Sequence, residues 1–351
     1  MGSSMGEPHP SLGLIARRLD VSLMTVSRAL RGKKGVGAKL RQRIIALAEE
    51  VGYRCDPNVS HVMASFRRSA SPTYRETIAF VRTHALSVVD EMIEGAREQA
   101  TKLGYKLELF QPWEQGLTGK GMSRVLHARG IRGVLLGPNS SAAHPRYWLE
   151  WKKFAVVLLG SSLVNSGLHR VQFDHYGSTL LALRKIQHAG YKRIGLVIDR
   201  SFHERAWHRQ MAAYQAYVGL PGAERDRLMF FFDSDVDLPR FLNWFKSERP
   251  DALLCDHEDC HDWLRHIQHT DPAEIGLAAL NVFRANSAVA GVRQHEAAIG
   301  REAVNVLVTQ LSAGQLGLQP LPHTLFVPGT WHNGSSLKRT GRPGAGGIKI
   351  R

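Results

Sequence analysis

The sequence predicts an α/β protein in which a small all-helical head precedes a larger core of two lobes built on parallel sheets. Positive charge is concentrated at the start: the first 75 residues hold 13 Lys/Arg against 5 Asp/Glu, whereas residues 76–337 hold 28 against 26. Apolar residues recur at helical spacing through the first 51 residues. From Thr77 onward, short apolar runs alternate with amphipathic segments, which is typical of repeated βα units.

Composition bounds the class of protein. A chain of 351 residues exceeds one ordinary domain, and its 43% hydrophobic and 22% charged residues are typical of globular proteins. No stretch approaches the ~18–20 apolar residues of a membrane helix, and residues 1–10 lack a signal pattern. Cys55, Cys255 and Cys260 are too scattered for a disulfide framework. We therefore expect a cytoplasmic protein with no membrane partner.

The head contains two short amphipathic segments with a tight turn between them. Ser11 can cap a first helix that ends near Asp20, and Ser22 can cap a second helix that runs to Arg31. A third helix at residues 38–51 would close a small core. Two short helices across a three- to four-residue turn form the geometry that places the second helix in a DNA major groove.

The outward side chains of the second helix are candidates for contact with double-stranded DNA. Arg28 can pair bidentately with guanine O6 and N7. Thr25 and Ser27 can hold phosphates, whereas Leu23 and Met24 can contact thymine methyl groups. A strongly basic head on a nearly neutral core is the charge distribution of a phosphate-binding module. The sequence therefore predicts a DNA-reading head that depends chiefly on Arg28.

This head resembles that of the lactose-repressor/galactose-repressor (LacI/GalR) family. The resemblance is carried by T-V-S-R at Thr25–Arg28 and by the exit sequence G-Y-R-C-D-P-N at Gly52–Asn58. Asp20 stands where the family usually has Gly, and Gly37-Ala38 replaces its usual Ser-Pro. The resemblance implies a homodimeric regulator, which we expect to be a repressor, on a pseudo-palindromic operator. The DNA-contacting candidates are Ser11, Ser22, Leu23, Met24, Thr25, Ser27, Arg28, Tyr53, Asn58, Met63 and Ala64.

After Asn58 the family has a hinge helix that inserts a leucine into the minor groove. Ala64 occupies that position here, with Met63 just before it. Either Met63 acts as the wedge or the DNA bend is weaker. The predicted divisions are a head at 1–56, a hinge helix and linker at 57–75, a core at 76–337, and a basic, disordered tail at 338–351.

The core resembles, more weakly, the periplasmic-binding-protein-like core of the same family. The resemblance is carried by residues 171–174, 189–195, 249–252, 290–294 and 299–304. It implies a small effector, a sugar or related metabolite, bound between the lobes at the carboxyl ends of strands. We expect core helices at Val88–Leu103, Ser178–Ala189, Glu204–Val218 and Glu296–Leu311.

The effector candidates follow from position in these predicted units. The family's sugar-binding Arg precedes an aromatic by four residues, so it falls on Gln210 when Tyr214 is that aromatic. Arg209 is one step away, and nearby Trp207 can stack on a ring. The departure at Gln210 leaves open a regulator that binds DNA without an effector. The candidates are Thr83, His84, Phe173, Trp207, Arg209, Gln210, Asp256 and Gln294.

Three other classes of function fit less well. Cys255–Asp262 offers thiols, imidazoles and carboxylates for zinc, but it lacks a C-x-x-C pair and follows a predicted strand, which favours a polar loop. We expect no metal and no cofactor. No complete set of nucleophile, base and orienting residue appears, so we expect no enzyme. A two-lobed small-molecule binding protein stays an alternative, which the basic head and the missing signal pattern disfavour.

Overall fold

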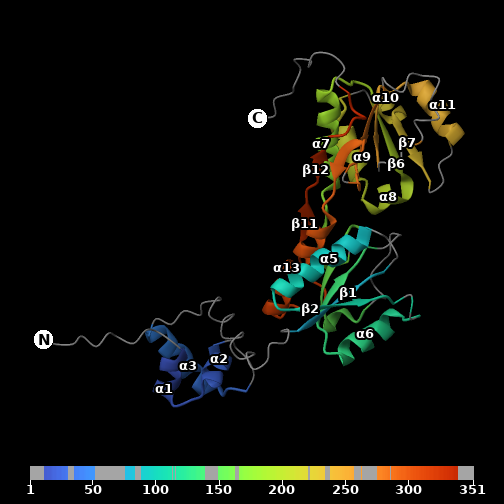
Figure 1. Cartoon of the computed structure of the whole chain (residues 1–351). Helices are drawn as coiled ribbons and strands as arrows, with labels where there is room; N and C mark the ends of the chain where they lie inside the picture. The colour runs from blue at the N-terminus through green and yellow to red at the C-terminus, as the bar shows by residue number, and fades with distance from the viewer. Residues whose placement is uncertain are drawn as a thin grey trace. The chain divides into compact units, whose positions relative to one another are not determined.

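The computed structural model describes residues 12–30, 35–51, 76–83, 88–112, 114, 116–138, 149–162, 166–219, 222–233, 238–256, 262, 275–284 and 286–338. Contacts divide the chain into two compact units, Met1–Thr73 and Tyr74–Arg351. We call them the head and the core and describe each by itself (Figure 1). No helix among these residues is both long and apolar enough to cross a membrane.

The head is built from three helices, which confirms the predicted all-helical unit. They are α1 (Leu12–Leu19), α2 (Leu23–Leu30) and α3 (Ala38–Glu50). Ile15 of α1, Val26 of α2 and Ile44 of α3 are fully buried together at the centre. Gly37 is the N-cap of α3 and makes no side-chain cap bond, because it has no side chain to offer.

The first lobe of the core is a six-stranded parallel sheet with helices on both faces. The strand order is β11-β5-β4-β3-β1-β2. Alternate side chains of β1 pack into hydrophobic clusters on opposite faces of the sheet. Ile78 and Phe80 pack with α5 and α13, whereas Ala79 and Val81 pack with α6. The elements are β1 (Thr77–Val81), α5 (Val88–Lys102), β2 (Lys106–Phe110), α6 (Gly119–Ala128), β3 (Gly133–Leu136), a 3₁₀ turn (Trp151–Lys153), β4 (Ala155–Leu159), β5 (His169–Phe173), α13 (Glu296–Ala313) and β11 (Thr324–Val327).

The second lobe repeats this plan. Its strand order is β12-β10-β9-β8-β6-β7, in which β12 runs antiparallel to β10 and the other neighbours are parallel. One face packs against α7 and α9, and the other packs against α11. The elements are α7 (His175–His188), β6 (Ile194–Asp199), α8 (Arg200–Arg205), α9 (Arg209–Tyr217), α10 (Gly222–Arg227), β7 (Met229–Phe232), α11 (Leu238–Glu248), β8 (Ala252–Cys255), β9 (Gly276–Ala279), β10 (Ala290–Arg293) and β12 (Thr330–His332).

The chain passes between the lobes three times. The passages lie between β5 and α7, between β10 and α13, and between β11 and β12. Figure 1 shows the consequence: the orange-red α13 and β11 lie beside the cyan and green elements of the first lobe, far from them in sequence. In that position α13 packs against α5, β3, β4 and β5.

One predicted helix is wrong in extent. The expected helix Glu204–Val218 is divided into α8 and α9, because Trp207 and His208 both have φ of +56°, in the left-handed region. By contrast, α5 and α13 agree with their predicted ranges to within two residues. The helix α7 begins three residues before the predicted Ser178, because the Asp174 side chain caps it by accepting from Gly177 N–H at 2.8 Å.

Candidate functional site

The turn between α1 and α2 sets how the second helix is presented. Asp20 has φ of +51°, a conformation that glycine adopts freely and that Asp tolerates better than most side chains. The Asp that departs from the usual Gly of the resembled head is therefore compatible with this turn. The turn closes when Val21 N–H donates to the Ala16 carbonyl at 3.0 Å. A hydrogen-bonded turn therefore joins the two helices, as the predicted head requires.

Ser22 caps α2, as predicted. Its Oγ accepts from the Thr25 backbone N–H at 3.1 Å and lies 2.9 Å from Thr25 Oγ1. Both hydroxyls are therefore paired with each other in the head. Contacts from Ser22 and Thr25 to phosphates stay predictions, and they would need to share these hydroxyls.

The two faces of α2 differ sharply in exposure. Val26 and Ala29 are buried in the head core, whereas Leu23 and Met24 are 57% and 55% exposed. Arg28 is also exposed. Within the described part of the head, Arg18 pairs with Glu50 at 3.6 Å, and Arg28 makes no ion pair. An exposed apolar pair beside an uncommitted guanidinium is suited to contact with base edges.

Several predicted DNA-contacting residues lie outside the described residues. They are Ser11, Tyr53, Asn58, Met63 and Ala64, and for Ser27 only the backbone is described. Their roles, and the choice of hinge wedge, stay predictions.

A second group of polar side chains gathers along one edge of the second-lobe sheet. Asp199 ends β6, Asp256 follows β8, Asn281 follows β9 by two residues, and Gln294 follows β10. These strands are neighbours in the order β10-β9-β8-β6, so the four residues line one edge. Oδ1 of Asp256, Oδ1 of Asn281 and Oε1 of Gln294 are buried and have no hydrogen-bond partner among the described residues. Buried oxygens without partners are costly, and a bound ligand relieves that cost.

Asp256 is the most perturbed of these groups. Burial raises its pKa well above the ordinary range, although its Oδ2 accepts from the Asp199 backbone N–H and Arg205 partly offsets the shift. A protonated carboxyl offers both a donor and an acceptor to a ligand. The side chain is therefore suited to a hydroxyl group.

The turn between α8 and α9 carries an aromatic and a basic side chain toward the first lobe. The Arg209 guanidinium lies 4.5 Å from the ring centroid of Trp207 and 5.0 Å from that of Phe326 in β11. On β5, the Arg170 guanidinium lies 5.0 Å from the same Trp207 ring. Burial lowers the pKa of Arg170 to about 10, and the charge of Arg209 contributes in the same direction. Contacts between the lobes therefore converge on Trp207.

The remaining effector candidates are placed as follows. Gln210 is buried beside this turn, and its Oε1 has no partner among the described residues. Phe173 lies at the first passage between the lobes, with its ring 6.0 Å from that of His175. Thr83 donates to the Pro138 carbonyl at 2.6 Å, so its proton is engaged within the first lobe. His84 lies outside the described residues.

Sequence reasoning missed two residues of this region. Asn281 follows a predicted strand just as Asp256 does, so the same rule would have found it. Arg170 gave no local signal, because its contact with Trp207, which is distant in sequence, brings it here. The described residues contain no group of three metal-ligating side chains that could hold an ion. Residues 257–261 of the candidate zinc segment lie outside the described part.

Comparison with known proteins finds a family match for the head and a similar fold for most of the chain. Residues 12–56 match the family of bacterial regulatory proteins termed the lacI family. The regulator NtdR of the NTD biosynthesis operon of Bacillus subtilis is 23% identical over 208 residues, which cover 57% of this chain and 59% of NtdR. The transcriptional regulator GntR of Pseudomonas aeruginosa is 32% identical over 144 residues, which cover 36% of this chain and 42% of GntR. The chain thus aligns with roughly half of the length of these relatives.

Solved structures agree on the architecture. A lac repressor dimer bound to operator and the anti-inducer ONPF is similar with a TM-score of 0.55 at 16% identity, covering 93% of this chain and 99% of that chain. A complex of the transcriptional regulator CelR with cellobiose is similar with a TM-score of 0.52 at 17% identity, and it also covers 93% of this chain and 99% of that chain. These similarities confirm the predicted fold class of a helical head on a two-lobed α/β core. The match to the lacI family of bacterial regulatory proteins thus covers the head, and the rest of the chain shares the two-lobed fold of these solved structures.

Proposed function

We propose that this protein is a sequence-specific DNA-binding transcriptional regulator that acts as a homodimer on a pseudo-palindromic operator. We expect it to repress transcription. The observation that carries the proposal is the exposed face of α2. Leu23, Met24 and Arg28 are exposed there, and Arg28 makes no ion pair within the described head. A regulator of this kind acts by binding rather than by catalysis, and it works in the cytoplasm, where bacterial DNA lies. Two-fold symmetry would place two heads on two half-sites.

Substitution of Arg28 by Ala tests base reading. We expect Arg28→Ala to weaken binding to the preferred duplex by about 1–3 kcal/mol, because a bidentate contact to guanine is lost, and to change binding to random DNA little. The preferred duplex is first selected from a random pool, and affinities are then measured at several salt concentrations.

The control variant is Arg184→Ala, which removes an exposed arginine of α7 in the core. It should bind both duplexes as the unmodified protein does. Equal losses on both duplexes for Arg28→Ala would make Arg28 a phosphate contact. A pool that yields no preferred sequence at any salt concentration would contradict the proposed function itself.

The proposal includes a small effector, with hydroxyl-rich molecules such as sugars and sugar acids as its class. Support comes from the partnerless buried oxygens of Asp256, Asn281 and Gln294 along one sheet edge of the second lobe. A few fixed polar groups that set a ligand's orientation are typical of small-molecule sites. CelR, a structural relative, is described in complex with cellobiose.

A thermal-shift screen tests the effector. A sugar or sugar acid that binds only the folded core raises its melting temperature. For the ligand found, Asp256→Ala should weaken binding by about tenfold or more, since a buried hydrogen bond is lost. Asp226→Ala, which removes an exposed carboxylate of α10, is the control and should bind normally.

A regulator without an effector is the second candidate. Arg209 favours it, because the guanidinium already occupies faces of Trp207 and Phe326 on which a ligand ring would stack. If no sugar or sugar acid shifts the melting temperature while operator binding is specific, this second candidate is correct.

A further inference from the structure

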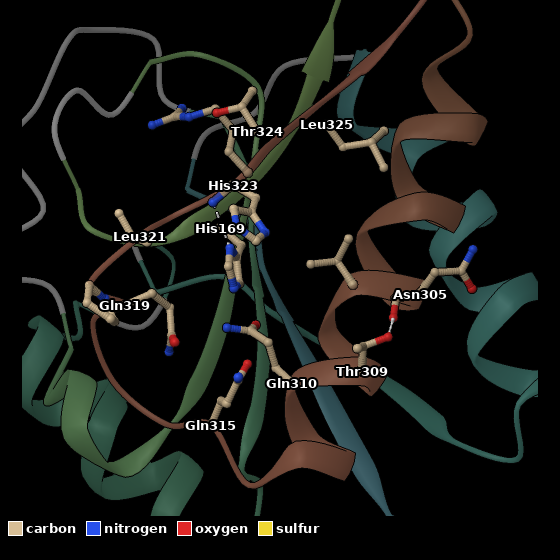
Figure 2. Close-up of a pocket in the computed structure, with 13 residues that line it drawn as sticks. His169, Asn305, Thr309, Gln310, Gln315, Gln319, Leu321, His323, Thr324 and Leu325 are labelled. Carbon is tan, nitrogen blue, oxygen red and sulfur yellow. Dashed lines mark hydrogen bonds between the residues drawn. The ribbon is translucent and has the colours of Figure 1, made fainter. Parts of the chain in front are cut away.

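The first lobe holds a pocket of about 760 Å³ that lies apart from the effector candidates. It opens between α13 and the segment Gln315–His323, above β5 and β11 (Figure 2). Only Arg170 is shared with the region around Trp207. Its size falls within the range of about 300–1,000 Å³ that small-molecule sites occupy.

Gln310 is the feature that marks this pocket as a binding site. Its side chain is only 2% exposed, and neither its Oε1 nor its Nε2 has a hydrogen-bond partner among the described residues. A neighbouring amide of the same pocket, Asn305, is satisfied: its Oδ1 accepts from Gln99 at 2.7 Å and its Nδ2 donates to Glu302 at 3.2 Å. A buried amide that lacks both partners is costly, so a ligand with a matching donor and acceptor would be stabilised here.

His169 contributes a donor and an aromatic face. Its Nδ1 accepts from the His323 backbone N–H at 2.9 Å, so the proton of the neutral ring lies on Nε2. Burial lowers the pKa of His169, and the charge of His323 adds to this, which keeps the ring neutral at pH 7. The two imidazole centroids are 5.1 Å apart. Figure 2 shows the amides of Gln310 and Gln315 pointing toward the His169 ring.

The charges of the pocket select against ions. The thirteen described residues that line it include no carboxylate and no lysine. The one permanent charge, the Arg170 guanidinium, donates to the Gly160 carbonyl at 2.6 Å and lies over the Trp207 ring. A charged ligand would thus find no counter-charge free to receive it, whereas a neutral ligand loses less on leaving water.

We propose that this pocket is a second ligand site, distinct from the effector region, which binds a neutral flat heterocycle with a donor and an acceptor side by side on one edge. That edge is typical of nucleobases, and a glutamine amide matches it in the bidentate manner in which Gln recognises adenine N6 and N7. Imidazole rings stack on the faces of such bases. Leu321 and Leu325 supply apolar contacts around the heterocycle.

Titration calorimetry of the full chain with adenine tests the proposal. We expect one adenine per chain, at least tenfold weaker binding to Gln310→Leu, and about threefold weaker binding to Gln315→Leu. Gln315 is exposed at the rim, so its substitution leaves the fold intact. Gln310→Leu should melt no lower than the unmodified protein, because it removes a buried amide without partners.

The controls separate this site from the effector region. Gln187→Leu, an exposed glutamine of α7, and Asp256→Ala should both bind adenine normally. Glucose and adenosine monophosphate, a polyhydroxyl and an anion, should bind at least tenfold more weakly than adenine. Adenine binding that Gln310→Leu leaves unchanged, tighter binding of glucose than of adenine, or no adenine binding at millimolar concentration would each overturn the proposal.

Discussion

Gly300→Ala should destabilise the core by about 3 kcal/mol, the upper part of the range for overpacking a buried contact. In an ordinary helix the same substitution stabilises by about 1 kcal/mol. The sign reverses here because α13 crosses α5 at Gly300, where an added Cβ would lie 1.9 Å from the Met92 carbonyl oxygen. Gly95 of α5 makes the reciprocal approach, at 2.0 Å from the Ala297 oxygen. Backbone would have to move against backbone at this crossing.

Urea unfolding of the core measures the effect. Gly222→Ala is the matched control, since a Cβ at this exposed first residue of α10 meets only the far end of Arg225 at 3.8 Å. It should change the free energy of unfolding by less than about 0.5 kcal/mol. Equal stabilities for Gly300→Ala and Gly222→Ala would show that the two helices separate at little cost.

Acid should destabilise the core through His175. The side chain is 7% exposed and packs against the edges of Phe173 and Phe202. Burial lowers its pKa to about 4, and the nearby Arg209 charge adds to the shift. Between pH 4 and the ordinary value of 6.5, the unfolded chain binds a proton that the folded protein excludes. Stability is therefore present above pH 6.5 and is lost as the pH falls, by about 2 kcal/mol at pH 5 for this residue alone.

His175→Leu removes the titrating group, so its unfolding free energy should depend less steeply on pH between 7.5 and 5. Part of the slope should persist, because burial lowers the pKa of His203 to about 4 as well, with the charges of His208 and Arg200 adding to the shift. His188→Leu replaces an exposed histidine of the same helix and should retain the full slope. Identical slopes in all three proteins would refute the assignment to His175.

Local sequence signals predicted the elements that local physics determines. The cap at Ser22 and the split of α2 into a buried and an exposed face follow from residues within one turn of each other. Asp256 and Gln294 were predicted from their places after strands, and the structure puts them on one sheet edge. Their roles toward an effector stay predictions, as do the DNA contacts of Arg28.

Features that depend on residues far apart in sequence could not be predicted. Helical spacing continues through Trp207 and His208, so the left-handed turn that separates α8 from α9 left no signal in the pattern. The pocket around Gln310 needs α13 and β11 to meet β5, which precedes both of them by more than a hundred residues. In the sequence alone, nothing distinguishes a buried glutamine of an amphipathic helix from the exposed polar residues of the same helix.

The three passages between the lobes also determine when the protein can fold during its synthesis. The head is a contiguous segment near the start, so it can fold as soon as it leaves the ribosome. The first lobe cannot, because α13 and β11 belong to its sheet and its helical layer and are translated after most of the second lobe. A nascent chain therefore exposes the buried faces of β1, β3 and β4 until nearly all of the chain has been made. A premature stop before α13 would leave a folded head attached to two incomplete lobes.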